Sequence, residues 1–152
     1  MSIDLAKLKE LRERSGVSFA LCKKALEQSN NDMSAAVKIL SEMAGAKIAE
    51  KSTRATGAGG MFTYVHHNKK IAALVEVLSE TDFVSGNIEF HKLGQEIALH
   101  IGSMPSKTVE ELLEQDYVRD PSKKIKDLIK DAVLKFGENI KISRFARWEL
   151  GV

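Results

Sequence analysis

Apolar residues recur at helical spacing through the first third of the chain. The first run stops at Ser15-Gly16, a pair that commonly ends helices, and the next two begin after good capping residues, Ser18 and then Asn31 or Asp32. The apolar positions of the three runs are Leu5, Leu8 and Leu11, then Cys22, Ala25 and Leu26, then Ala36, Ile39, Leu40 and Met43. Residues 1–52 are therefore predicted to form a three-helix bundle, typical of a small binding module.

Residues 53–60 separate this bundle from a segment with a different pattern. Their sequence, TRATGAGG, is rich in Gly and Thr and lacks apolar periodicity, which is typical of a flexible linker. From Met61 onwards, two runs rich in β-branched and aromatic residues flank the sequence HHNKK. This pattern predicts a β-hairpin that turns at Asn68.

Helical periodicity returns after Gly86 and is broken by prolines. One apolar stripe ends at Pro105, a short helix follows, and a longer helix runs from Pro121-Ser122 to Gly137. The stripes are Phe90, Leu93, Ile97, Ile101 and Met104 in the first helix, and Ile125, Leu128, Ile129, Ala132, Val133 and Phe136 in the last. Because strands and helices are segregated, residues 61–152 are predicted to be α+β, an antiparallel sheet with helices on one face.

The C-terminal segment alternates and predicts the third strand of this sheet. One side carries Ile140, Ile142, Ala146, Trp148 and Leu150, and the other carries Lys141, Ser143, Phe145, Arg147 and Glu149. The strand is therefore expected to be half buried. Phe145 is then the one apolar residue on the outward side.

Composition and charge limit the possible partners. The 23 basic and 21 acidic residues nearly cancel, and the lysines of residues 123–130 are interleaved with aspartates, which disfavours direct nucleic-acid binding. Cys22 is the only cysteine, so no disulfide can form within the chain. We expect a cytoplasmic protein with no membrane partner, because neither a signal peptide nor a membrane-length apolar stretch is visible.

Motifs for catalysis, metals and cofactors are not evident. His66 and His67 are adjacent in a strand and so point to opposite faces, and His91 and His100 lie half a helical turn out of alignment. The glycines of residues 57–60 lack the Gly-Lys-Ser/Thr of a phosphate loop. We expect no metal, no cofactor and no catalytic residue.

An acid beside a phenylalanine follows the second predicted strand, in the sequence EVLSETDFVSG. Asp82 could cap a helix while Phe83 joins the core. Alternatively, the pair could be exposed and contact another macromolecule. The residue pattern alone leaves both interpretations open.

Three ordered blocks carry a resemblance to a known family: LRERSGVSFALCKKALEQSNNDMSAAVKIL, YVHHNKKIAALVEVLSETDFV and KFGENIKISRFARWELG. The whole chain resembles bacterial elongation factor Ts, the nucleotide exchange protein of the GTPase elongation factor Tu. The family signature Thr-Asp-Phe-Val is intact as Thr81, Asp82, Phe83 and Val84. The resemblance implies that this tip disturbs the magnesium and phosphate site of GDP-bound elongation factor Tu, so that GDP leaves and GTP can enter.

The resemblance also implies a second contact with the GTPase through the N-terminal bundle. Arg12 and Lys51 match basic positions associated with this contact. Phe19 and Ala20 stand where family members have two methionines, and Leu21 replaces an aspartate. We expect the contact to persist with altered packing, in which Phe19 supplies the bulk.

The chain is short for this family, whose longer members contain two related halves of the core domain. Short members are understood to compensate by forming homodimers through their sheets, which would explain an outward Phe145 at a dimer interface. An alternative of a different class is an adaptor whose bundle, similar to ubiquitin-associated modules, binds some other protein.

Overall fold

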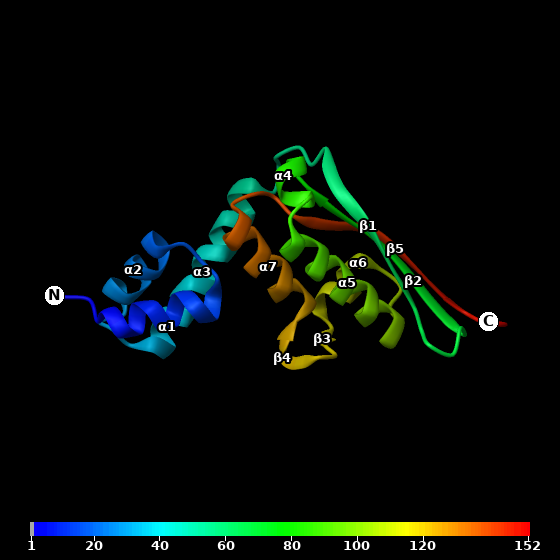
Figure 1. Ribbon diagram of the computed structural model, residues 1–152, viewed down its shortest axis with the longest axis horizontal. Helices are drawn as coiled ribbons and strands as arrows, with labels where there is room; N and C mark the ends of the chain where they lie inside the picture. The colour runs from blue at the N-terminus through cyan, green and yellow to red at the C-terminus, as the bar shows by residue number, and fades with distance from the viewer. Residues whose placement is uncertain (1) are drawn as a thin grey trace.

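Three helices build the N-terminal part of the molecule (Figure 1). The computed structural model describes residues 2–152, apart from the side chain of Ala44. The helices are α1 (Leu5–Ser15), α2 (Phe19–Gln28) and α3 (Met33–Lys51). The side chains of Asp4, Ser18 and Asp32 accept hydrogen bonds from backbone N–H groups of the first turns. The predicted three-helix arrangement is confirmed.

A small hydrophobic core holds these helices together. Cys22, Ala25 and Leu26 of α2 are completely buried against α1 and α3. The same core contains Leu134, which belongs to a helix of the second part of the chain. The bundle is therefore packed onto the rest of the molecule.

A three-stranded antiparallel sheet opens the second part. Its strands, in the order β1-β2-β5, are β1 (Ala58–Val65), β2 (Ile71–Ser79) and β5 (Lys141–Glu149). The hairpin turns where expected, with Lys69 in the left-handed region at a φ of 64° and the Asn68 side chain bonded to the backbone two residues later. Residues 58–60, expected in the linker, belong to β1.

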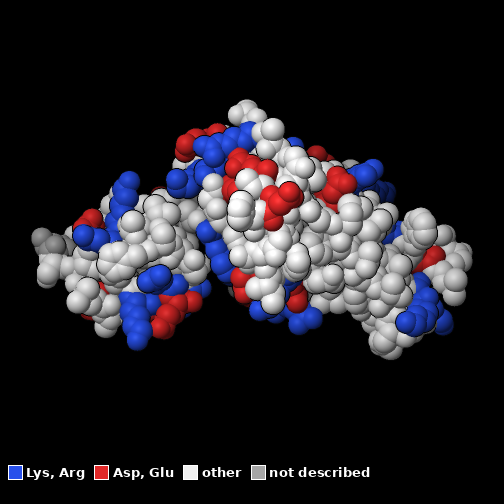
Figure 2. Space-filling model, turned by 45° about the horizontal axis from the view of Figure 1, so that its top comes forward, with Lys and Arg blue, Asp and Glu red and all other residues white. Residues whose placement is uncertain are grey.

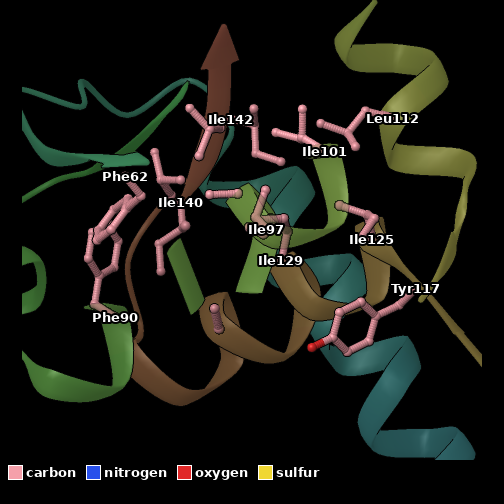
Figure 3. Close-up of a cluster of buried hydrophobic side chains, with 14 of the residues drawn as sticks. Phe62, Phe90, Ile97, Ile101, Leu112, Tyr117, Ile125, Ile129, Ile140 and Ile142 are labelled. Atoms are coloured by element: carbon pink, nitrogen blue, oxygen red, sulfur yellow. The ribbon is translucent and has the colours of Figure 1, made fainter. Parts of the chain in front are cut away.

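Two helices, α5 (Ile88–Ser103) and α7 (Ile125–Phe136), supply the apolar layer against one face of the sheet. Gly94 lets α5 approach β1 closely, because a Cβ at that position would collide with the Phe62 ring. Figure 3 shows the resulting core, where the centroids of the Phe62 and Phe90 rings are 5.9 Å apart. Full burial of each such side chain contributes roughly 1.5–3 kcal/mol.

Residues 116–124 contain structure that the sequence pattern did not predict. After α6 (Val109–Glu114), the short strands β3 (Asp116–Tyr117) and β4 (Asp120–Lys124) pair with each other. Pro121 and Ser122 lie in β4 and do not begin a helix. Instead α7 begins after Lys124, whose backbone N–H donates to the Asp127 carboxylate at 2.8 Å. Strands this short and polar produce no recognisable alternation.

The prediction that Phe145 faces outward is wrong. The register of β2 and β5 passes from the pair Glu76–Arg144 to the pair Val77–Ile142, which leaves Ser143 unpaired as a β-bulge. A bulge shifts the alternation of side chains by one residue, so Phe145 packs against the core. Ala146 and Trp148, expected on the buried side, face outward instead, and Trp148 is 77% exposed.

His100 is buried in α5 as a neutral, fully bonded ring. Its Nε2 lies 2.9 Å from Gln115 Oε1, and its Nδ1 accepts from the backbone N–H of Val118 at 3.2 Å. An amide oxygen and an N–H partner together require a proton on Nε2 only. Burial lowers the pKa of the His100 imidazole below its ordinary value, since the charged form is poorly solvated.

We therefore expect the free energy of unfolding to fall when the protein is acidified below about pH 6.5, the ordinary histidine pKa. In that range the unfolded chain binds a proton at position 100 that the folded chain excludes, so stability falls by up to about 1.4 kcal/mol per pH unit until the lower folded-state pKa is reached. Above that range the contribution is constant. Urea unfolding across this pH range measures the effect, and a His100→Gln variant with an unchanged pH profile would contradict it.

Candidate protein-contact site

The Thr81–Val84 segment forms an exposed tip where β2 ends. Thr81 is the cap of a one-turn helix, α4 (Asp82–Ser85), and its Oγ1 accepts from the backbone N–H of Val84 at 3.5 Å. Val84, which the resemblance placed among the contact residues of the tip, is only 7% exposed and belongs to the main core instead. Since successive residues of a helix point about 100° apart, anchoring Val84 directs its neighbour Phe83 away from the core.

The exposure of Asp82 and Phe83 decides whether they are a helix cap and a core residue or an exposed contact pair. Phe83 is 93% exposed, so it is not part of the core. Asp82 is also exposed and lies in the first turn of α4, while Thr81 is the capping residue. A large aromatic ring held almost entirely in water beside a carboxylate is typical of a contact surface.

One residue that holds the tip could not be recognised from the sequence pattern. The carboxylate of Glu138 accepts hydrogen bonds from the backbone of Glu80 and Thr81 and from the Thr81 hydroxyl. Its neighbours along the chain give no sign of this role, because the partners lie 57 and 58 residues away. Its place in the block KFGENIK, which carries part of the resemblance, was the only available signal.

The N-terminal bundle presents a second surface. Arg12 of α1 and Phe19 and Ala20 of α2 are all exposed, whereas Leu11 and Cys22 of the same helices face the bundle core. Phe19 is 51% exposed. In Figure 1 the tip α4 lies at the top of the sheet, whereas α1 and α2 lie beyond α3 and α7, so the two surfaces are separate.

Lys51 does not lie on either surface, contrary to expectation. It is only 7% exposed, and its ammonium group donates to the backbone carbonyl of Gly137. Gly137 closes α7 in the left-handed region at a φ of 71°. The carbonyls at the end of a helix attract a cation, so Lys51 belongs to the joint between α3 and α7.

On the face shown in Figure 2, basic and acidic groups are interspersed, and no basic band crosses it. Within residues 2–152, no three His, Cys, Asp or Glu side chains converge as a metal site would require. The helices of the same residues are too short or too polar to span a bilayer.

An antiparallel sheet with an exposed aromatic tip, and a small helical bundle beside it, are typical of proteins that act by contact with another macromolecule. The sequence profile of the family described as Elongation factor TS matches residues 80–151. Elongation factor Ts of Herpetosiphon aurantiacus is 38% identical over 196 residues, which cover 99% of each chain. Elongation factor Ts of Thermosipho melanesiensis is 37% identical over 189 residues, covering 95% of this chain and 96% of the relative. The chain belongs to the elongation factor Ts family.

Two further features of the comparisons describe the size of this chain. The alignment of 196 residues exceeds the chain's 152 residues by 44, so at least that many positions of the Herpetosiphon relative have no counterpart here. Elongation factor Ts of Clostridium acetobutylicum is 44% identical over 146 residues, which cover 96% of this chain but 47% of the relative. The chain thus spans about half the length of the Clostridium relative.

The exposure of the tip predicts which phenylalanine matters for stability. Phe83→Ala should change the free energy of unfolding by less than about 0.5 kcal/mol, because the ring makes few contacts in the folded chain. The matched substitution Phe90→Ala removes a ring of 0% exposure and should cost about 3–5 kcal/mol. Urea unfolding of both variants measures the difference. A loss above about 2 kcal/mol for Phe83→Ala would show that the ring supports the fold.

Proposed function

We propose that the protein is a guanine-nucleotide exchange factor for elongation factor Tu and acts in the elongation step of translation, in the cytoplasm. Membership of the elongation factor Ts family is the main support. The structural observation that carries the proposal is the 93% exposure of Phe83 beside Asp82 on an anchored tip.

Exchange requires differential affinity. A GTPase holds GDP through its phosphate site and a magnesium ion, so a factor accelerates release only if it binds the nucleotide-free conformation more tightly. By linkage, the factor weakens the binding of GDP by the same free energy by which GDP weakens the binding of the factor. The tip must therefore make contacts that exist only when the nucleotide site is disturbed.

Phe83 acts as the wedge. Its ring enters an apolar crevice near the nucleotide site, and the transfer of one aromatic ring out of water is favourable by roughly 1.5–3 kcal/mol. The ring is already exposed and carried on a short helix whose Val84 is fixed in the core. Little of the binding free energy is then spent on rearranging the factor itself.

Asp82 supplies the charge. Its exposed carboxylate comes close to the groups that position the water shell of magnesium, where it competes for their hydrogen bonds. Added negative charge beside the phosphates also disfavours retention of GDP. Asp82 does not need to bind the metal to have either effect.

The bundle acts as a clamp on a separate region of the GTPase. Arg12, Phe19 and Ala20 remain the contact residues of this proposal, because all three are exposed. Lys51 is left out, since its ammonium group is bonded inside the joint. The binding free energy of this remote contact offsets the free-energy cost of disturbing the nucleotide site.

We also propose that the protein is a homodimer joined through the outer face of its sheet. Four large apolar side chains lie on that face and are 40–77% exposed: Met61, Val65, Leu74 and Trp148. An apolar patch of this kind is costly in water and self-complementary in a twofold pair. Phe145, the residue first expected at the interface, packs against the core instead. It therefore lies on the face of the sheet opposite the exposed patch.

The exchange activity is tested by the release of fluorescently labelled GDP from elongation factor Tu. The wild-type protein should accelerate release, and Phe83→Ala should reduce this acceleration by about 10- to 100-fold, because one ring burial is lost. Asp82→Ala should reduce it as well. Ile88→Ala, a change at another exposed apolar residue (67%), is the matched control and should retain activity. Unchanged GDP release with the wild-type protein would refute the proposal, and capture of a different partner would favour an adaptor.

The dimer is tested by light scattering over a dilution series. The wild-type protein should have twice the mass of one chain at high concentration. Trp148→Glu should shift it to the monomer, because a carboxylate cannot be buried in an apolar interface without a partner. Lys9→Glu, at an exposed position of α1 in the N-terminal bundle and away from the sheet, is the control. A wild-type protein that is monomeric and active throughout the series would exclude the dimer.

A further inference from the structure

The tip is held by three hydrogen bonds to a single side chain. Glu138 Oε1 accepts from the backbone N–H groups of Glu80 at 3.2 Å and Thr81 at 3.1 Å, and Oε2 accepts from Thr81 Oγ1 at 2.7 Å. The Thr81 hydroxyl in turn accepts from Val84 N, so the carboxylate continues directly into the cap of α4. Hydrogen bonds to a charged acceptor are the stronger kind.

The backbone of Glu138 is itself fixed on both sides. The carbonyl of Gly137 accepts from the buried Lys51 ammonium group, and Asn139 Nδ2 donates to the carbonyl of Arg54 at 3.0 Å. Asn139 is 5% exposed. Both partners belong to the end of α3 and the residues that follow it, so residues 137–139 are attached to the segment that leaves the N-terminal bundle.

A third link closes this arrangement. Arg54 Nη1 lies 3.7 Å from Glu80 Oε1, a buried oxygen that has no hydrogen-bond partner among the described residues 2–152. The ion pair with Arg54 is thus the compensation for its burial. The end of α3, the tip and residues 137–139 therefore contact one another pairwise.

We propose that Glu138 is the positioning residue of the tip, and that it keeps Phe83 in a fixed orientation relative to the N-terminal bundle. The proposal rests on the proposed function, in which bundle and tip engage one GTPase together. Two surfaces on a rigid body reinforce each other only if their relative position matches the partner. Without Glu138, two backbone N–H groups and a hydroxyl lose their acceptor, and the tip must be ordered during binding.

Exchange kinetics distinguish positioning from affinity. Glu138→Ala should lower the maximal rate of GDP release about tenfold, roughly the effect of ordering one further residue. The concentration of factor at half-maximal rate should change less, because the bundle contact is intact. Glu138→Gln retains an oxygen for the two N–H groups and should restore most of the rate. Glu111→Ala, which removes another carboxylate that accepts from a backbone N–H (Lys107, 3.2 Å), is the matched control.

A double-mutant comparison separates action through the tip from direct contact or general stability. If Glu138 acts through Phe83, then Glu138→Ala added to Phe83→Ala should cause little further loss. A full additional tenfold loss would overturn the proposal, as would a rate for Glu138→Ala equal to that of the wild-type protein.

Amide hydrogen exchange measures the positioning without any GTPase. In Glu138→Ala the amides of Glu80, Thr81 and Val84 should exchange at least about tenfold faster, while those of α1 and α2 stay unchanged. Unchanged exchange at these three amides would overturn the proposal. Because this measurement needs no nucleotide release, it tests the role of Glu138 even if the exchange function itself fails its test.

Discussion

The burial of α7 in two hydrophobic cores at once is the interaction on which the rest of the structure depends. Ile129 and Val133 belong to the core beneath the sheet, while Leu134 belongs to the core of the N-terminal bundle. The end of the same helix accepts the Lys51 ammonium group. A bundle of this size has a marginal core of its own, so packing against α7 both stabilises it and sets its orientation. The two proposed contact surfaces consequently belong to one body.

The tip shows how a fold can keep an apolar ring exposed. Val84 is buried in the core. Because adjacent residues of a helix point about 100° apart, Phe83 then points away from the core. Hydrogen bonds to Glu138 fix the residues before the helix. The exposed ring contributes little to stability, and its orientation is set by its neighbours. Such a division, in which some residues anchor and one projects, suits a protein that must insert a side chain into a partner.

The bulge in β5 has a comparable effect on the opposite face of the sheet. One unpaired residue, Ser143, turns Phe145 towards the helices and Trp148 towards water. The outer face thereby gains Trp148 beside the exposed apolar side chains Met61, Val65 and Leu74 of β1 and β2. The chain lacks at least 44 positions that the Herpetosiphon relative contains, and its own three-stranded sheet is covered by helices on one face only. A short chain with a closed core and an open sheet face is consistent with assembly in pairs.

The sequence by itself determined the local structure and the nature of the tip residues. Helix caps, the hairpin turn at Asn68 and the apolar stripes act over a few residues, so the three-helix bundle and the α+β arrangement could be predicted, and the Thr-Asp-Phe-Val motif pointed to the family. Only the tertiary structure decided that Phe83 is exposed, that Lys51 is buried, that Phe145 faces the core and that Glu138 holds the tip. Each of these depends on partners far apart in the chain, or on a bulge that changes the register of two strands, and neither leaves a periodic signal in the sequence.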